Sequence, residues 1–126
     1  MNREFRSDLP IYVQLIRQIR QEIVSGAMPP GERLPSVREI AAELGVNPNT
    51  VQRALQELER DGLIYTQRTS GRFVTEDAAA ISRCREMLAG ELIRDFLAAM
   101  TPLGYQRQAI VRLLQEEKEE EHECDS

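Results

Sequence analysis

Apolar residues recur at helical spacing between Leu34 and Asp61, which predicts two short helices joined by a tight turn. The apolar positions of the first helix are Val37, Ile40, Ala41 and Leu44, and those of the second are Val51, Ala54, Leu55 and Leu58. Spacings of three and four place each set on one side of a helix. Two amphipathic helices around a glycine turn, here Gly45-Val46, are typical of a helix-turn-helix, whose second helix can enter a DNA major groove.

Another helix is predicted before this pair. It should run from Leu9-Pro10 to about Ser25, because four apolar residues lie four apart along it: Ile11, Leu15, Ile19 and Ile23. Gly26 is a natural C-cap for this helix. Residues 1–9 are mostly polar, which indicates a loose N-terminal arm.

Two short strands are predicted after the pair of helices. Residues 63–66 and 72–75 are rich in residues that favour strands, and Gly71 gives the link between them a flexible backbone position. A hairpin directly after a DNA-reading helix is a wing, so residues 10–75 predict a winged helix-turn-helix. The alternative is a hairpin that only completes the fold.

The last third of the chain predicts two more helices after a linker at residues 76–77. The first, from residue 78 to about Met100, has an apolar stripe of Ile81, Cys84, Leu88, Leu92 and Phe96. Thr101-Pro102 should cap the second, whose apolar residues are Tyr105, Ala109, Ile110, Leu113 and Leu114. The fold class is therefore mostly α with a small β-hairpin. Residues 117–126 form an acidic tail that we expect to be disordered.

The two C-terminal helices carry more apolar surface than a hairpin alone can cover. They are too short to enclose a ligand pocket of the usual size, about 300 Å³ or more. Burial against a second copy of the chain is the simplest solution, so we expect residues 78–116 to form a dimerisation region. The dimer contacts would be Ile81, Cys84, Leu88, Leu92, Phe96, Ile110, Leu113 and Leu114. The alternative is that the first of these helices folds back on the winged domain within one chain.

Charge is distributed unevenly along the 126 residues. The net charge of −5 is unfavourable for a nucleic-acid binder, but residues 1–75 contain 10 Arg against 9 Asp and Glu, whereas residues 76–126 contain 6 Lys and Arg against 12 Asp and Glu. The acidic excess therefore lies in the C-terminal part. Arg suits bidentate contacts to phosphate and guanine, although 15 Arg against one Lys can also reflect genome composition.

The predicted helix starts carry capping signals. Ser36 and Glu39 have the spacing of a capping box, and Arg38 would point outward from the first turn. Ser36 is thus a helix cap and, at a duplex, a candidate phosphate contact. Asn47 is the expected cap of the second helix, with Pro48 at the first helical position, where its missing N–H has no cost.

The face of the second helix opposite the apolar set is rich in amide and guanidinium groups. It carries Asn49, Gln52, Arg53, Gln56 and Arg60. Asn and Gln can read adenine and Arg can read guanine, whereas a plain solvated face more often carries Glu and Lys. In the predicted wing, Arg68 and Arg72 are candidates for contact with phosphate or the minor groove.

Several of these motifs together resemble the GntR family of bacterial transcriptional regulators, over roughly residues 10–75. They are Pro30-Gly31-Glu32-Arg33-Leu34-Pro35-Ser36-Val37-Arg38-Glu39-Ile40-Ala41, Gly45-Val46-Asn47-Pro48-Asn49-Thr50-Val51, Arg53-Ala54-Leu55, Leu58-Glu59, Asp61-Gly62-Leu63-Ile64 and Gly71-Arg72-Phe73-Val74. The short C-terminal region, the Asn47–Val51 segment and Leu103-Gly104-Tyr105 are similar to the YtrA-like subfamily. In that subfamily two C-terminal helices serve mainly for dimerisation.

The resemblance implies a winged helix-turn-helix that binds a palindromic operator as a dimer. It assigns DNA contact to Arg38, to Asn49, Thr50, Gln52 and Arg53, and to the wing tip at Thr69, Ser70 and Gly71. With the residues argued above, the full DNA-binding set adds Ser36, Asn47, Gln56, Arg68 and Arg72. Many members carry Arg or Ser where this chain has Asn47-Pro48-Asn49, so their base preference does not transfer.

Other site chemistries find little support in the sequence. The single histidine, His122, lies beside Glu121, Glu123 and Cys124 in the acidic tail, without a second cluster that would define a metal site. No nucleophile set, phosphate loop or dinucleotide motif occurs, so we expect neither an enzyme nor a cofactor. Cys84 lies on the apolar stripe, which favours a core thiol over a redox sensor.

Two functions remain open from the sequence. The first is a homodimeric transcriptional regulator, preferably a repressor, that binds a pseudo-palindromic operator. The second is a winged-helix adaptor that binds protein and has no sequence-specific DNA binding. No segment is long and apolar enough to cross a membrane and no signal peptide opens the chain, so we expect a cytoplasmic protein; any small-molecule effector stays unknown.

Overall fold

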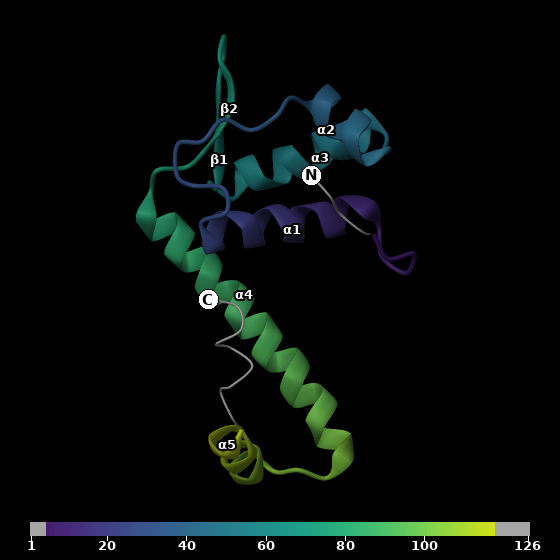
Figure 1. The fold of residues 1–126 in the computed structure, drawn as a ribbon, viewed down its shortest axis with the longest axis vertical. Helices are drawn as coiled ribbons and strands as arrows, with labels where there is room; N and C mark the ends of the chain where they lie inside the picture. Colours follow the sequence, from purple (N-terminus) through teal and green to yellow (C-terminus); the bar gives the residue numbers. More distant parts are fainter. Residues whose placement is uncertain (1–4, 118–126) are drawn as a thin grey trace. The chain divides into compact units, whose positions relative to one another are not determined.

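The computed structural model describes residues 5–117 (Figure 1). In chain order its elements are α1 (Ile11–Ser25), α2 (Val37–Leu44), α3 (Pro48–Arg60), β1 (Ile64–Gln67), β2 (Gly71–Val74), α4 (Ala78–Met100), the 3₁₀ turn η1 (Thr101–Leu103) and α5 (Arg107–Glu116). The chain divides into two compact units, and the boundary along the sequence lies between Met87 and Leu88. Residues 1–4 of the predicted arm and residues 118–126 of the predicted disordered tail lie outside the described residues.

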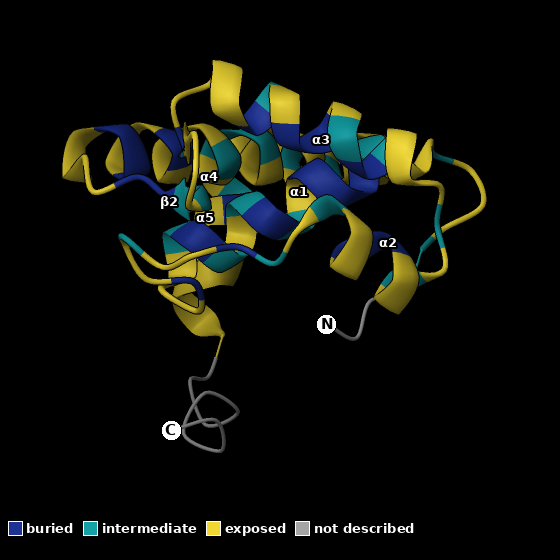
Figure 2. Cartoon of the chain, turned by 90° about the horizontal axis from the view of Figure 1, so that it is seen from above, coloured by how far each residue is buried: buried dark blue, intermediate teal, exposed yellow. Residues whose placement is uncertain are grey.

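The core of the first unit forms where α1, α2 and α3 bring their apolar stripes together. Figure 2 shows the buried side of α3 turned toward α1 and its outer turns exposed. The largest fully buried side chains are Leu15, Ile19, Ile23, Ile40, Val51, Leu55, Leu58, Ile64 and Val74. Full burial of such a side chain contributes about 1.5–3 kcal/mol. The helical stripes predicted for residues 15–23 and 37–58 are thereby confirmed, whereas Ile11, at the start of the first stripe, is 38% exposed and lies outside the core.

The ends of these helices follow the capping signals. Gly26 and Gly45 adopt left-handed conformations, with φ of 88° and 68°, where a side chain would be strained. Gly45 thus ends α2 and turns the chain toward α3. Ser36 and Glu39 form both bonds of the predicted capping box, and Asn47 caps α3 with Pro48 at its first position.

The residues before α1 are tied to it by Gln14, which is buried. The Gln14 side chain accepts a hydrogen bond from the Arg6 N–H at 2.6 Å. It also donates to the carbonyl oxygens of Arg6 and Leu9, at 2.7 and 2.8 Å. Residues 6–9 are therefore held in place, whereas the sequence indicated a loose arm.

The wing is an antiparallel hairpin in which Ile64 pairs with Val74 and Gln67 with Gly71. Both strands lie one residue nearer the turn than predicted, at residues 64–67 and 71–74. This shift arises because the Leu63 N–H bonds to Leu58 O at the end of α3. The residues just outside the two strands are still hydrogen-bonded, because the Thr75 N–H donates to the Leu63 carbonyl oxygen at 2.9 Å.

The segment before α2 runs alongside β2 and fixes the hairpin to the helices. Gly31 N–H donates to Val74 O at 2.9 Å, Val74 N–H to Glu32 O at 2.9 Å, and Leu34 N–H to Arg72 O at 2.8 Å. The wing therefore shares backbone hydrogen bonds with the chain that leads directly into α2.

The first turns of α4 pack within the first unit. Ala80, Ile81 and Cys84 are 7–8% exposed. Arg85 donates to the carbonyl oxygen of Val24, near the end of α1, at 2.9 Å. This part of the helix therefore folds back on the winged domain within one chain, as the alternative in the sequence analysis supposed. Ile81 and Cys84 are accordingly covered by their own chain.

The second unit contains the rest of α4, η1 and α5. We expected Thr101-Pro102 to cap the last helix, with Tyr105 inside it, and this detail is wrong. Thr101–Leu103 is a separate 3₁₀ turn that ends at Gly104, whose φ of 91° interrupts the helix. α5 consequently begins at Arg107, after Tyr105. Ile110 is the one side chain of this unit that is buried among the described residues.

Candidate nucleic-acid interface

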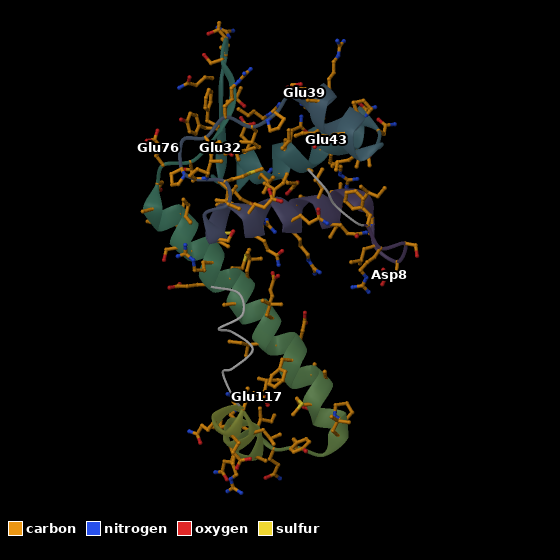
Figure 3. All side chains as sticks on the ribbon, viewed as in Figure 1. Asp8, Glu32, Glu39, Glu43, Glu76 and Glu117 are labelled. Carbon is orange, nitrogen blue, oxygen red and sulfur yellow. The ribbon has the colours of Figure 1, made fainter. Side chains whose placement is uncertain are left out.

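The N-terminus of α2 presents Arg38 beside a cap that already uses several polar groups. Ser36 Oγ accepts from Glu39 N–H at 3.1 Å, and Ser36 N–H donates to Glu39 Oε1 at 2.9 Å. Figure 3 labels Glu39 on α2. A phosphate that approached this helix end would meet the Glu39 carboxylate, so its donors would be the Ser36 hydroxyl and the exposed Arg38 guanidinium.

The capping box also makes this helix end sensitive to acid. Hydrogen bonds from the Ser36 backbone and side chain hold the pKa of Glu39 below its usual value, and the charge of Arg33 adds to this. A depressed carboxyl pKa stabilises the fold above the pKa of the unfolded chain. This stabilisation is lost as pH falls through the folded-state value.

We therefore predict that Glu39→Gln is less stable than the wild type at neutral pH, and that the difference shrinks below about pH 4, where the free carboxyl also becomes protonated. Urea unfolding of both proteins between pH 7 and pH 3 measures it. Glu43→Gln, on the same helix, is the control for loss of one charge. A difference that stayed constant over this range would show that the charged cap has no role in stability.

The first turn of α3 exposes Asn49 and half-exposes Thr50. Asn47 Oδ1 accepts from the Asn49 N–H at 2.8 Å, so the side-chain amide oxygen of Asn47 is used in capping the helix. With Pro48 in between, the turn carries no charged side chain. It can offer amide and hydroxyl groups to a base edge or a phosphate.

The outer face of α3 continues with Arg53 and Gln56, both exposed, and with Gln52, which is half-buried. Arg60, at the end of this face, pairs with Glu57 at 2.7 Å. Arg53 is the cation of this face that contacts an aromatic ring. Its guanidinium carbon lies 3.7 Å from the centre of the Tyr12 ring, and its Nη2 donates to the Tyr12 hydroxyl at 3.1 Å.

The wing tip consists of Arg68, Thr69 and Ser70, all exposed, followed by Gly71. Side chains there point away from the helices (Figure 3). Arg72 has a different setting from the one that the sequence suggested. Its Nε lies 3.7 Å from Glu59 Oε1 and its side chain is only 21% exposed. Of the two wing arginines, Arg68 is thus the one at the accessible tip.

Arg33 belongs to this surface although the sequence analysis did not select it. Its Nε donates to the carbonyl oxygen of Ser70 at 2.8 Å. A Cβ atom on Gly71 would lie 3.1 Å from the same nitrogen, so the glycine allows the guanidinium to lie close to the hairpin. Because 37 residues separate Arg33 from Ser70, no local pattern could have indicated this contact.

We predict that Arg33→Ala loosens the wing tip. The variant should exchange the amide hydrogens of residues 68–71 faster, while exchange in α1 and α3 stays unchanged, because an exposed hydrogen bond contributes only about 0.5–1.5 kcal/mol and is local here. Hydrogen–deuterium exchange with peptide-level detection measures this. Arg38→Ala, on the neighbouring helix end, removes the same charge and serves as the control. Equal exchange at the wing in all three proteins would contradict the prediction.

The apolar surface predicted for dimerisation is partly covered and partly exposed. Within the second unit, Leu92 is 64% and Leu114 is 59% exposed. Phe96 and Leu113 are also exposed, whereas Leu88 is half-buried and Ile110 buried. Beyond the predicted set, four further exposed apolar side chains belong to this unit: Ile93, Leu103, Tyr105 and Val111.

The described part of the chain holds no candidate metal site. Between residues 5 and 117 no three His, Cys, Asp or Glu side chains come together as a metal site would require. Glu121, His122, Glu123 and Cys124 lie outside the described residues. Among the described helices, none combines the length and apolar character that a membrane crossing needs.

Comparison with known proteins gives matches that include all of the candidate DNA-contact residues. Residues 11–74 match the family described as "Bacterial regulatory proteins, gntR family". The chain is 38% identical to the uncharacterized HTH-type transcriptional regulator YhcF of Bacillus subtilis, over 88% of this chain and 92% of YhcF. It is 49% identical to the HTH-type transcriptional repressor YtrA of the same organism, over 58% of this chain and 56% of YtrA.

One solved structure adds a bound nucleic acid to the comparison. It is the DNA-binding domain of AraR in complex with operator ORR3, which superimposes with a TM-score of 0.51 at 31% identity. The match covers 60% of this chain and 88% of the AraR chain. The family match over residues 11–74 includes the helix-turn-helix and the wing.

Proposed function

The chain belongs to the GntR family of bacterial regulatory proteins and is a DNA-binding transcriptional regulator with YtrA-like relatives, and from this premise we propose that it is a homodimeric repressor of a pseudo-palindromic operator. The family confirms the resemblance stated for residues 10–75. It also excludes an enzyme as the main function. Four points go beyond the family membership and are proposed here: the operator symmetry, the dimer, the sign of regulation and the contact residues.

The single observation that carries the DNA contact is the outer side of the helix-turn-helix. Asn49, Arg53 and Gln56 are exposed on α3 while the opposite side of that helix is fully buried. Amide and guanidinium groups at base edges give direct readout in a major groove. The operator complex of the AraR domain, which has this fold, supports DNA binding by the winged helix-turn-helix.

The proposed DNA contacts fall into two groups. The start and outer face of α3 would read the bases, through Asn47, Asn49, Thr50, Gln52, Arg53 and Gln56. The N-terminus of α2 and the wing would contact the DNA backbone, through Ser36, Arg38, Arg68, Thr69, Ser70, Gly71 and Arg72. Arg72 would have to exchange Glu59 for a phosphate, so we expect it to contribute less than Arg68.

The dimer is supported by apolar area that the chain leaves uncovered in its second unit. Six large apolar side chains on α4 and α5 of this unit are 38–64% exposed: Leu92, Ile93, Phe96, Val111, Leu113 and Leu114. Contiguous exposed apolar surface commonly marks an interface between subunits. The proposed contacts are Leu88, Leu92, Phe96, Leu113 and Leu114. Ile81, Cys84 and Ile110, which were in the predicted set, are left out because their own chain already buries them.

Repression is proposed from the relative YtrA, which is a transcriptional repressor. A dimer would place two copies of α3 in successive major grooves, about one helical turn apart. Blocking a promoter in this way needs no activator surface.

Titration of duplex DNA against the full-length protein tests the function. Sites are first selected from random duplexes, and the affinity for the selected site and for a scrambled site is then measured at two salt concentrations. A regulator should prefer the selected site, and its affinity should fall steeply with salt, with a log–log slope of about −0.9 per phosphate contact. An adaptor without sequence-specific DNA binding would enrich no site and show no such preference.

A further inference from the structure

Tyr12 is an aromatic residue of α1 that reaches the outer face of the adjacent helix α3. α1 and α3 lie side by side in the first unit (Figure 1), and Tyr12, half-buried near the start of α1, contacts the exposed Arg53. Two interactions join the pair. The Arg53 guanidinium carbon is 3.7 Å from the Tyr12 ring centre, and Arg53 Nη2 donates to the Tyr12 hydroxyl at 3.1 Å.

Such a pair restricts a side chain that is otherwise very mobile. A free Arg side chain carries about 2 kcal/mol of rotamer entropy. Stacking on a ring and a hydrogen bond to its hydroxyl select one orientation of the guanidinium before any partner arrives. A group that is already oriented loses less entropy when it binds.

The geometry leaves Arg53 able to make further contacts. A guanidinium has five N–H donors, and the hydroxyl of Tyr12 takes one of them. The ring covers a face of the guanidinium, whereas base edges and phosphates are bound through its N–H groups. Arg53 itself is exposed. Tyr12 thus holds the side chain without occupying the groups that would recognise a base.

We infer that Tyr12 is a positioning residue for DNA recognition, which orients Arg53 from outside the helix-turn-helix. This inference rests on the proposed function. It extends the specificity-determining residues to α1, a helix whose other buried residues serve the core. Tyr12 acts through Arg53 and needs no contact with DNA of its own.

A double-mutant cycle on the full-length protein tests this role. The four proteins are the wild type, Tyr12→Leu, Arg53→Ala and the double variant, and each is titrated with the selected duplex and with single-base variants of it. Tyr12→Leu should weaken binding to the selected duplex about threefold to tenfold, from the lost cation–π contact and orientation. In the Arg53→Ala background the same change should have no further effect.

Two readouts separate positioning from a general effect on folding. The loss in Tyr12→Leu should be confined to the base pairs whose preference also disappears in Arg53→Ala, and the affinity for scrambled DNA should stay unchanged. Tyr12→Phe, which keeps the ring, should recover most of the affinity. If Tyr12→Leu does not fold, the cycle is measured with Tyr12→Phe, for which a loss of about twofold is expected only in the presence of Arg53.

The outcomes distinguish this inference from the function on which it rests. Enrichment of no site by the wild-type protein would overturn the proposed function itself. Clear binding by the wild type with no change in Tyr12→Leu, or an equal loss in the presence and absence of Arg53, would overturn the role of Tyr12 alone.

Discussion

Leu55→Ala should lower the free energy of unfolding by about 2–5 kcal/mol, the usual range for removing a fully buried leucine side chain. Leu55 is 0% exposed on the side of α3 that faces the core. The cavity would lie beneath the helix that carries the proposed base contacts. Since small domains are stable by only about 5–15 kcal/mol, this loss removes a large share of the total stability. Urea unfolding followed by circular dichroism measures the change.

Gln56→Ala is the matched control, because it shortens the next side chain of the same helix at an exposed position. It should change the free energy of unfolding by less than about 0.5 kcal/mol. A similar loss in both variants would mean that α3 is not anchored through its buried face. Because Gln56 is a proposed base contact, this control is compared with the wild type in stability and not in DNA affinity.

Leu92→Glu should convert the proposed dimer of the full-length protein into a monomer and weaken operator binding by about a hundredfold or more. Leu92 is 64% exposed in the isolated chain, so a glutamate there does not disturb the core of the subunit. At an apolar interface the same carboxylate would be desolvated without a partner, which costs several kcal/mol. Two linked half-site contacts gain about 10² to 10⁴ in affinity over one, and a monomer loses this gain.

Sedimentation velocity gives the mass, and titration of the selected duplex gives the affinity. Gln115→Glu adds the same charge at an exposed polar position of α5 and should leave the dimer intact. A wild-type protein that sediments as a monomer at micromolar concentration, or a Leu92→Glu variant that remains dimeric, would contradict the proposed interface.

The helices could be predicted because their information is local. The stripe of Val51, Ala54, Leu55 and Leu58 and the caps at Ser36 and Asn47 depend on residues no more than a few positions apart. The hairpin was also predictable, within one residue at each strand end. The start of β1 could not be placed as well, because Leu63 bonds both to the end of α3 and to Thr75 beside the strand pair.

The contacts between distant residues could not be read from the sequence. Arg53 with Tyr12, Arg33 with Ser70 and Arg72 with Glu59 bring together side chains from different elements. Each contact changes how the arginine that makes it is understood. The stripe along α4 was also ambiguous, because one periodic pattern serves two settings. Ile81 and Cys84 are covered within the first unit, whereas Leu92 and Phe96 are exposed in the second.

The backbone bonds between residues 31–34 and β2 have a consequence for the kinds of DNA that the protein can accept. Leu34 is held to Arg72 in the wing, and two residues later the chain enters the capped start of α2. The hairpin and that helix end therefore cannot change their spacing independently. A duplex whose groove width or curvature does not match this spacing has to deform, at an energy that depends on its base sequence. If the protein binds DNA as proposed, base pairs that no side chain touches can therefore still influence where it binds.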